Sequence, residues 1–199
     1  FKNMRFVHFI QLFRFVFTRY ILRRKIPVSA VFAITYRCQC SCVHCSVGDY
    51  YEKRELSTDE AKEVIKAIKG LGSLKITFFG GEPLIRTDIT ELVRYASSIG
   101  LRTSIDTNGV MVDNLLIERL KIAGISNINV SLDSSDPIIH NYLRKYDGCF
   151  EKAINAIKLC VRYKIPVIVS TYASKRSIKE KDLEKIIKLA KELKANGVK

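Results

Sequence analysis

The sequence lacks a long uncharged hydrophobic run, has no internal low-complexity segment, and carries no acidic residue before Asp49. Its most apolar stretch, residues 6–22, is interrupted by two arginines, a histidine and a glutamine. A membrane-spanning helix needs about 20 mostly apolar residues, so we exclude a transmembrane segment. No small-residue cleavage site follows this stretch closely, which also disfavours a signal peptide.

The net charge of +14 over 199 residues is concentrated at the two ends of the chain. Residues 1–48 hold eight Lys/Arg and no Asp/Glu, and residues 175–199 hold nine against four. The middle, residues 49–174, is nearly neutral, with 17 bases and 16 acids, and does not interleave bases with aromatic residues. We therefore expect no nucleic-acid partner across the body, whereas the basic ends permit an acidic partner or an anionic membrane.

Residues 1–26 are predicted to form an N-terminal extension with a basic, aromatic, amphipathic helix. Arginines among Phe, Val and Leu are typical of a helix that lies on a membrane surface. The alternative is a helix that covers the open bottom of the following domain or contacts a further segment. The sequence leaves both open.

Four of the six cysteines lie within Cys38–Cys45, while Cys149 and Cys160 stand alone. This pattern favours a metal centre in a reducing compartment over secreted disulfides, and we expect a cytoplasmic protein. Cys38, Cys42 and Cys45 have the spacing C-x3-C-x2-C, which lets one loop present three thiolates to an iron–sulfur cluster and leaves one iron open. The alternative is a structural zinc site that uses all four thiols, or three thiols with His44.

From residue 27 onward, short apolar runs alternate with helical stripes, which predicts βαβ units and a parallel sheet in one domain, 27–199. Five such units form either an open partial barrel or a doubly wound sheet. We expect a last strand to start at Gly197-Val198-Lys199, and therefore that the last strand and any C-terminal extension lie beyond this sequence. The predicted strands are 28–35, 75–79, 101–106, 127–133 and 166–172.

Local signals set the helix boundaries. Capping boxes are predicted at Ser57-x-x-Glu60 and Asp88-x-x-Glu91. In such a box the side chain of each of the two residues accepts a hydrogen bond from the backbone N–H of the other. The helix after the first box should stop near residues 70–72. Further helices are expected at about 112–123, at 137–145, over the stripe Phe150, Ala153, Ile154, Ile157, and over the stripe Leu183, Ile186, Ile187, Ala190, the last one ending at Gly197.

Polar residues gather where the strands end, which is where parallel α/β folds bind ligands. Gly80-Gly81-Glu82-Pro83 follows the second strand, and its glycines allow the backbone to approach a ligand closely. The fourth strand alternates apolar residues with Asn129, Ser131 and Asp133, which indicates a polar ligand, or a wet interior, on one face.

Taken together, these motifs resemble the radical S-adenosylmethionine (radical SAM) superfamily over residues 28–196. The resemblance rests on Cys38, Cys42 and Cys45 after the first strand, on the GGEP motif after the second, on Thr107-Asn108-Gly109 after the third and on Ser131-Leu132-Asp133 at the fourth. It implies a partial parallel (β/α)6-type barrel. It also implies a [4Fe-4S] cluster, reductive cleavage of SAM to methionine and a 5′-deoxyadenosyl radical, and hydrogen abstraction from a substrate.

The resemblance further implies the site residues. Cys38, Cys42 and Cys45 would hold the cluster, Gly80, Gly81 and Glu82 would bind the methionine amino group, and Ser131, with Asp133 or Asn108, would bind the carboxylate or ribose. Arg144 is a second candidate for the carboxylate, since a guanidinium suits it bidentately. His44 stands where the family often has an aromatic residue near adenine. No catalytic side chain is predicted, since hydrogen abstraction needs no dedicated nucleophile; Asp106 and Tyr172 are weighed only as residues at the mouth.

Three cysteines have no role in this pattern. Cys40 is interpreted as a bystander, Cys160 as a core residue that continues the stripe of Ile157, and Cys149 is left unassigned.

The expected partners are SAM, an electron donor such as flavodoxin or ferredoxin, and a peptide or small-molecule substrate. The alternative is a non-enzymatic zinc-binding module with basic ends on nucleic acid.

Overall fold

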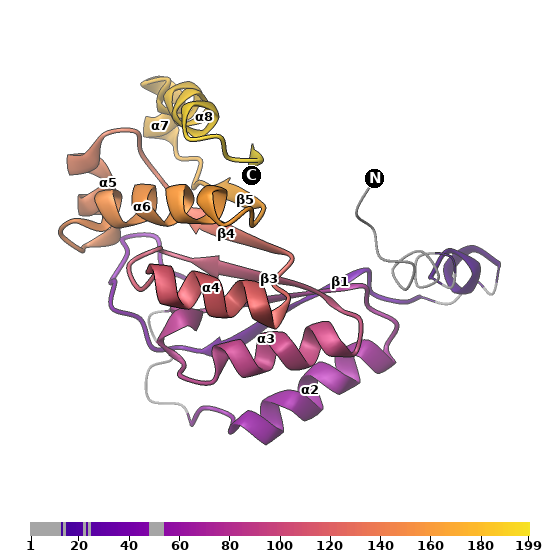
Figure 1. The fold of residues 1–199 in the computed structure, drawn as a ribbon. Coiled ribbons are helices and arrows are strands. Elements are labelled where there is room, and N and C mark those ends of the chain that lie inside the picture. Colours follow the sequence, from indigo (N-terminus) through magenta and orange to yellow (C-terminus); the bar gives the residue numbers. More distant parts are fainter. Residues whose placement is uncertain (1–12, 14, 22, 24, 48–53) are drawn as a thin grey trace.

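The computed structural model describes residues 13, 15–21, 23, 25–47 and 54–199. Six parallel strands form one sheet in the order β1-β2-β3-β4-β5-β6. The strands are β1 (Ser29–Thr35), β2 (Lys75–Gly80), β3 (Arg102–Thr107), β4 (Asn127–Ser131), β5 (Val167–Ser170) and β6 (Gly197–Val198). Each strand lies next to the one that follows it in the chain, and crossover connections between parallel strands share one hand. The helices therefore lie on one face of the sheet, as Figure 1 shows. This confirms the open partial barrel over the doubly wound sheet.

The described helices are α2 (Thr58–Gly70), η3 (Pro83–Ile85), α3 (Ile89–Ser98), α4 (Asn114–Ala123), α5 (Pro137–Arg144), α6 (Cys149–Arg162), α7 (Lys175–Lys179) and α8 (Asp182–Glu192). The core lies between these helices and the sheet. Phe78, Ile105 and Val130 from the strands pack there against side chains such as Leu92 and Ile157.

The capping box of α2 is confirmed, because the Ser57 hydroxyl accepts from the Glu60 N–H and the Glu60 carboxylate accepts from the Ser57 N–H. The box predicted at Asp88 and Glu91 is wrong. Asp88 is the N-cap residue of α3 but makes no side-chain cap there. Its carboxylate is instead bound by Arg86, and a guanidinium is a stronger partner than a backbone N–H.

The C-terminal part departs from the expectation in three places. The helix α8 ends at Glu192, before Gly197; the last strand does start at Gly197, as expected, and pairs as β6 with Ile168 and Val169 of β5. Ile187, expected in the buried stripe of α8, is 43% exposed. The short helix α7 was not predicted, because its five residues carry no apolar stripe.

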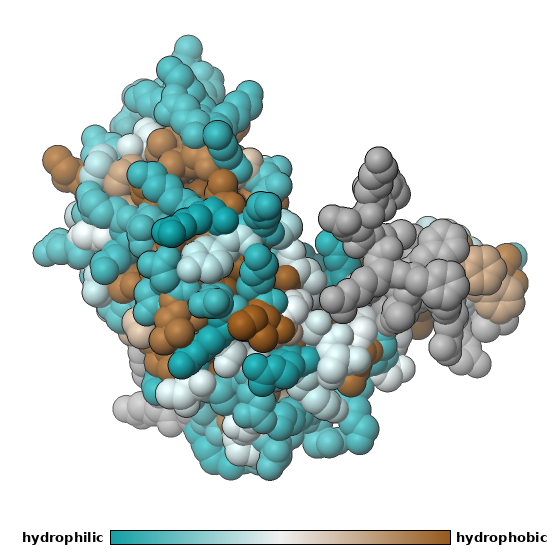
Figure 2. All heavy atoms as spheres, viewed as in Figure 1, coloured by the Kyte–Doolittle hydropathy of each residue, from teal (hydrophilic) through white to brown (hydrophobic). Residues whose placement is uncertain are grey.

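Little of the N-terminal extension falls within the described residues. There the chain forms η1 (Phe17–Ile21), whose described residues are all at least partly exposed. Figure 1 shows η1 standing apart from the sheet, and Figure 2 shows hydrophobic atoms on this projecting segment. Within this segment Tyr20 and Ile21 are 70% and 65% exposed. Among the described residues, no helix is both long and apolar enough to span a membrane. The rest of the predicted amphipathic helix lies outside the described residues.

Candidate functional site at the carboxyl edge of the sheet

The loop that carries the cysteines is bonded to the end of β2 through backbone groups. The Gly81 N–H donates to the Thr35 carbonyl, and the Glu82 N–H donates to the Arg37 carbonyl, both at 2.8 Å. A Cβ atom on Gly81 would lie 2.7 Å from the Tyr36 carbonyl oxygen and closer still to that of Arg37. The glycine is therefore required by the approach of the cysteine loop itself, whereas the sequence suggested the approach of a ligand.

Gly80 meets the same loop one residue earlier. Its φ of +129° is a conformation that side chains rarely adopt, and an added Cβ would overlap the Thr35 carbonyl oxygen. Both glycines thus let β2 and the start of the cysteine loop lie against each other.

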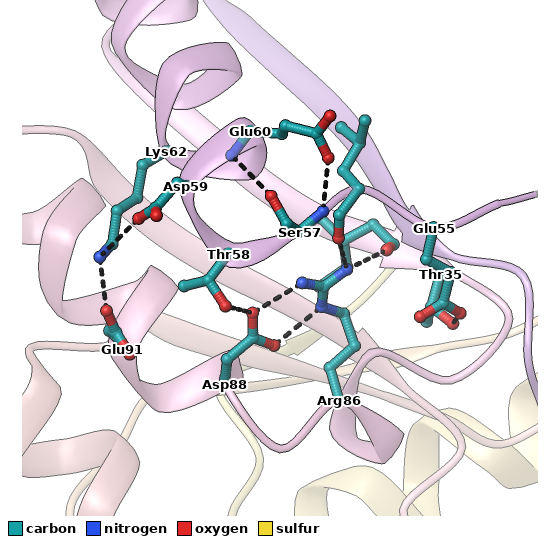
Figure 3. Close-up of polar contacts among 12 residues, drawn as sticks. Thr35, Glu55, Ser57, Thr58, Asp59, Glu60, Lys62, Arg86, Asp88 and Glu91 are labelled. Atoms are coloured by element: carbon teal, nitrogen blue, oxygen red, sulfur yellow. Dashed lines mark hydrogen bonds and ion pairs between the residues drawn. The ribbon is translucent and has the colours of Figure 1, made fainter.

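A buried ion pair fixes the return of the same loop, as Figure 3 shows. The Arg86 guanidinium binds Asp88 bidentately at 2.8 and 2.6 Å, and its Nη1 donates to the carbonyls of Ile34 and Leu56. These two carbonyls belong to β1 and to the segment just before α2, so one side chain joins both ends of the loop. Asp88 also accepts from Thr58 at 2.7 Å. The sequence reading missed Arg86, although an arginine two residues before an aspartate was visible.

An open pocket of about 180 Å³ lies at the carboxyl edge of β1 to β4. It is lined by most of the predicted site residues, namely Cys38, Cys42, His44, Cys45, Gly80, Gly81, Asn108, Ser131 and Arg144, and also by Ser46, Val47, Phe79, Asp106 and Thr107. Pockets that enclose drug-sized ligands measure about 300–1,000 Å³. A nucleoside-sized ligand would therefore lie partly above this pocket, on its open side.

Glu82, a predicted ligand of the methionine amino group, does not line the pocket. Its carboxylate is fully buried and accepts from the N–H of Leu84, the hydroxyl of Thr107 and the N–H of Asn108 at 2.8–3.0 Å. Burial raises the pKa of Glu82 to about 7, against the lowering effect of these donors. In this structure the carboxylate joins the end of β2 to the end of β3.

Each residue of the Thr107-Asn108-Gly109 segment lies against a neighbouring part of the protein. The Thr107 hydroxyl bonds Glu82, and Gly109, at φ +84°, would bring a Cβ within 3.0 Å of the Ala153 backbone. The Asn108 side-chain amide points its Nδ2 at the sulfurs of Cys38 and Cys40, at 3.7 and 3.5 Å.

The thiols of the loop receive hydrogen bonds from the protein. The pKa of Cys42 is lowered to about 6, first by its hydrogen bond with the Cys40 thiol and then by the charge of Arg144, whose Nη1 lies 3.7 Å from Cys42 Sγ. The pKa of Cys38 is also lowered, first by its bond with Cys40. Cys40 is buried and its pKa is raised, first by its hydrogen bond with Cys149. Among the described residues, no three His, Cys, Asp or Glu side chains are grouped to hold a single metal ion.

Cys149 lies beside this thiol group. It is fully buried at the start of α6, and its hydrogen bonds with Cys40 and then with His140 lower its pKa to about 5. Sequence reasoning left Cys149 unassigned, because it is more than 100 residues from the loop and only the fold brings the two together. Cys160 is buried in the core, as expected.

Asp133, the other predicted site residue that does not line the pocket, is bound to residues that do. Its Oδ2 lies 2.6 Å from Arg144 Nη2 and 3.4 Å from His44 Nε2, and its Oδ1 accepts from the Tyr172 N–H at 3.0 Å. The His44 ring stacks on Tyr172 with centroids 4.7 Å apart and an interplanar angle of 4°. Burial lowers the pKa of His44, which favours the neutral ring at neutral pH.

The interior face of β3 and β4 is polar, as the alternation of the fourth strand predicts. The Asn129 amide donates to Ser104 at 3.1 Å and to the Asp106 carboxylate. Asp106 also pairs with Lys199 Nζ at 3.3 Å. Many polar side chains of this face therefore bond one another, and Asp106 and Ser131 are members of the face that reach the pocket.

The family model of the radical SAM superfamily matches residues 32–190. The chain belongs to the radical SAM superfamily. It is 34% identical to the AdoMet-dependent heme synthase of Methanosarcina barkeri (strain Fusaro / DSM 804) over 84% of this chain and 48% of that protein. It is 36% identical to the Fe-coproporphyrin III synthase of the same organism, over 78% of this chain and 39% of that protein. The chain thus spans less than half the length of these curated relatives.

Solved radical SAM structures share the fold. SuiB of Streptococcus suis bound to the precursor peptide SuiA covers 93% of this chain and 42% of its own, with a TM-score of 0.78 and 17% identity. The structure of anSMEcpe with bound AdoMet covers 86% of this chain and 51% of its own, with a TM-score of 0.68 and 21% identity. The superfamily match favours the enzyme over the non-enzymatic zinc module.

The residues at the pocket fit the two cofactors that radical SAM enzymes use, a [4Fe-4S] cluster and SAM. The three thiols of the C-x3-C-x2-C motif line one pocket together with the Gly80-Gly81 edge. Two buried polar atoms of pocket residues, Arg144 Nε and His44 Nδ1, have no hydrogen-bond partner among the described residues. Because buried polar atoms are normally paired, these two indicate a polar ligand at this position.

Proposed function

We propose that this radical SAM chain binds its cluster through Cys38, Cys42 and Cys45 and uses SAM to modify a tetrapyrrole in the making of a heme-type cofactor. The observation that carries the substrate class is the 34–36% identity to a heme synthase and an Fe-coproporphyrin III synthase over about four fifths of the chain. The matched regions are long enough to include most of the pocket.

When bound, the cluster and SAM supply one-electron reductive cleavage and hydrogen abstraction; the protein orients and shields the reacting groups. Gly80, Gly81 and Ser131 would contact the methionine part of SAM from the strand ends. Arg144, held by Asp133, would place its free Nε toward the carboxylate. Glu82 and Asp133 would not contact SAM themselves; Glu82 would position Asn108, and Asp133 would position Arg144.

His44 lines the pocket and its ring stacks on Tyr172, and this pair of rings would suit the adenine of SAM. Tyr172 is 53% exposed, so its outer face remains open. Tyr172→Ala should weaken SAM binding several-fold, because base–aromatic stacking contributes about 1–3 kcal/mol per base in nucleic-acid complexes. Isothermal titration with SAM on the reconstituted chain measures this effect.

Substrate class is tested by anaerobic reconstitution of the chain, reduction with dithionite, and incubation with SAM and Fe-coproporphyrin III. We expect the tetrapyrrole absorption band to shift on binding. We also expect 5′-deoxyadenosine, measured by mass spectrometry, to form faster when the tetrapyrrole is present. If SAM is cleaved but no tetrapyrrole binds or changes that rate, the proposed substrate class is wrong.

Peptide modification is the second candidate. It is favoured by the structural likeness to SuiB in its complex with the precursor peptide SuiA, which extends over 93% of this chain. A peptide substrate would leave the tetrapyrrole assay negative while SAM cleavage persists. For either substrate we propose a flavodoxin or ferredoxin as the one-electron donor.

A further inference from the structure

Asn108 is held in one orientation by the groups around its side chain. Its amide oxygen accepts from the Val110 N–H at 2.9 Å and from Gln39 Nε2 at 3.0 Å, so both lone pairs are used. Its backbone N–H donates to Glu82 at 2.8 Å, and the residue is only 5% exposed. The amide nitrogen can therefore face only the other side.

On that side lie two sulfurs. Asn108 Nδ2 is 3.7 Å from Cys38 Sγ and 3.5 Å from Cys40 Sγ. The Cys40 N–H adds a second donor to Cys38 Sγ at 3.4 Å. Cys38 is a ligand in the proposed function, so the Asn108 amide points at a ligand sulfur. The family resemblance instead offered Asn108, as an alternative to Asp133, for the carboxylate or ribose of SAM.

Hydrogen bonds to the sulfurs are one of the factors that set the reduction potential of an iron–sulfur cluster. Reduction adds one negative charge, which is shared with the ligand sulfurs. An N–H donor therefore stabilises the reduced form more than the oxidised form, and its removal makes the cluster harder to reduce.

We propose that Asn108 is a positioning residue that raises the reduction potential of the cluster by donating to Cys38, and that it is not a ligand of SAM. The inference rests on the proposed function, since it requires the cluster on Cys38. The Glu82 carboxylate helps to hold Asn108 in this position, because it accepts a hydrogen bond from the Asn108 backbone N–H.

The test compares Asn108→Ala and Asn108→Asp with the unchanged chain, each reconstituted anaerobically and titrated with dithionite without SAM. The reduced cluster is counted by electron paramagnetic resonance at fixed solution potentials. We expect the reduced-to-oxidised ratio to fall about fivefold in Asn108→Ala, the factor that one ordinary hydrogen bond corresponds to. The ratio should fall further in Asn108→Asp, since a carboxylate oxygen would replace the N–H donor.

Gln39→Ala is the matched control. It removes one of the two donors to the Asn108 oxygen but leaves the Val110 N–H in place, so the potential should stay unchanged. SAM affinity is measured on the same samples. It should be unchanged in Asn108→Ala and reduced in Ser131→Ala.

The outcomes separate this inference from the proposed function. If the unchanged chain takes up no iron and sulfide, the proposed function fails. If the cluster forms and Asn108→Ala keeps the original potential but loses SAM affinity, the inference is overturned and Asn108 is a SAM ligand. Should Asn108→Asp not retain a cluster, Asn108→Ala alone decides between the two.

Discussion

The Nη2 atom of Arg144 lies 2.6 Å from Oδ2 of Asp133, and both side chains are nearly buried, with 12% and 2% of their surface exposed. The same guanidinium reaches Cys42 Sγ through Nη1. Arg144 comes from the end of α5 and Asp133 from the segment after β4, so this pair connects the cysteine loop to the fourth strand.

Arg144→Met should therefore destabilise the chain without its cluster by about 3–5 kcal/mol, because it leaves a buried carboxylate without its partner. Urea unfolding measures the loss. The double variant Asp133→Asn with Arg144→Met should regain most of it, since no unpaired charge remains and Asn still accepts from the Tyr172 N–H. Equal stability of the single and double variants would contradict a paired role.

Gly81→Ala should prevent assembly of the cluster. The added methyl group would lie well under 3.0 Å from the carbonyls of Tyr36 and Arg37 and would push the loop away from β2. We expect a loss of at least about 2 kcal/mol in stability, as for other overpacked sites. Gly70→Ala is the control, because a Cβ at Gly70 would meet no atom within 4 Å. Iron and sulfide content after reconstitution is the measurement.

Cys42→Ala should abolish both the cluster and SAM cleavage, while Cys40→Ala should retain them. Cys42 lines the pocket, whereas Cys40 is buried against Cys149 and does not line it. Absorbance of the brown cluster and formation of 5′-deoxyadenosine report the result. If both variants lose the cluster, the assignment of Cys40 as a non-ligand is wrong.

Glu82 should make the chain without its cluster less stable as the pH rises. Its pKa is about 7 when folded and 4.5 in its ordinary state, so folding favours the protonated form. Its contribution is greatest below pH 4.5 and is lost as the pH rises to 7. Over that pH range the contribution of Glu82 to the free energy of unfolding falls by roughly 3 kcal/mol.

The pH effect of Glu82 is isolated by subtracting the unfolding free energies of Glu82→Gln from those of the unchanged chain at each pH. The difference should decline between pH 4.5 and 7 and be flat above pH 8. A flat difference across the whole range would show that the Glu82 carboxyl titrates normally.

Of the two roles that the sequence leaves open for residues 1–26, binding to an anionic membrane is the one that sedimentation tests; their basic and aromatic composition and the exposed Tyr20 and Ile21 suit it. The full chain should sediment with liposomes that contain an anionic lipid, and a chain that begins at residue 27 should not. Neutral liposomes are the control, since they lack the electrostatic attraction. Equal sedimentation of the two chains would rule out this role for the extension.

Much of the fold was predictable because its signals are local. The box at Ser57 and Glu60 and the stripe Phe150, Ala153, Ile154 and Ile157 depend only on helical spacing, and the structure confirms them. The box at Asp88 failed because a residue outside the pattern, Arg86, competes for the carboxylate. The Arg86–Asp88 ion pair forms where the two ends of the cysteine loop meet, and the spacing of residues along the sequence does not show that meeting point.

The site was predictable as a set of residues, and less so as a geometry. The motifs bring Cys38, Gly81 and Arg144 to one pocket, as the strand-end argument predicts. They do not show that Glu82 turns inward to Thr107 and Asn108, or that Cys149 lies against Cys40. The first contact depends on how the ends of β2 and β3 lie together, and the second on how α6 packs on the sheet.

The carbonyls of Thr35 and Arg37 find their N–H donors only at Gly81 and Glu82, more than 40 residues later. As the chain is synthesised from its N-terminus, the thiols of Cys38, Cys42 and Cys45 therefore leave the ribosome well before the strand that anchors their loop. Arg144 and Cys149 arrive later still. In the proposed function these thiols would therefore wait for both their anchoring strand and their cluster, and a reducing environment would keep them from oxidising in the meantime.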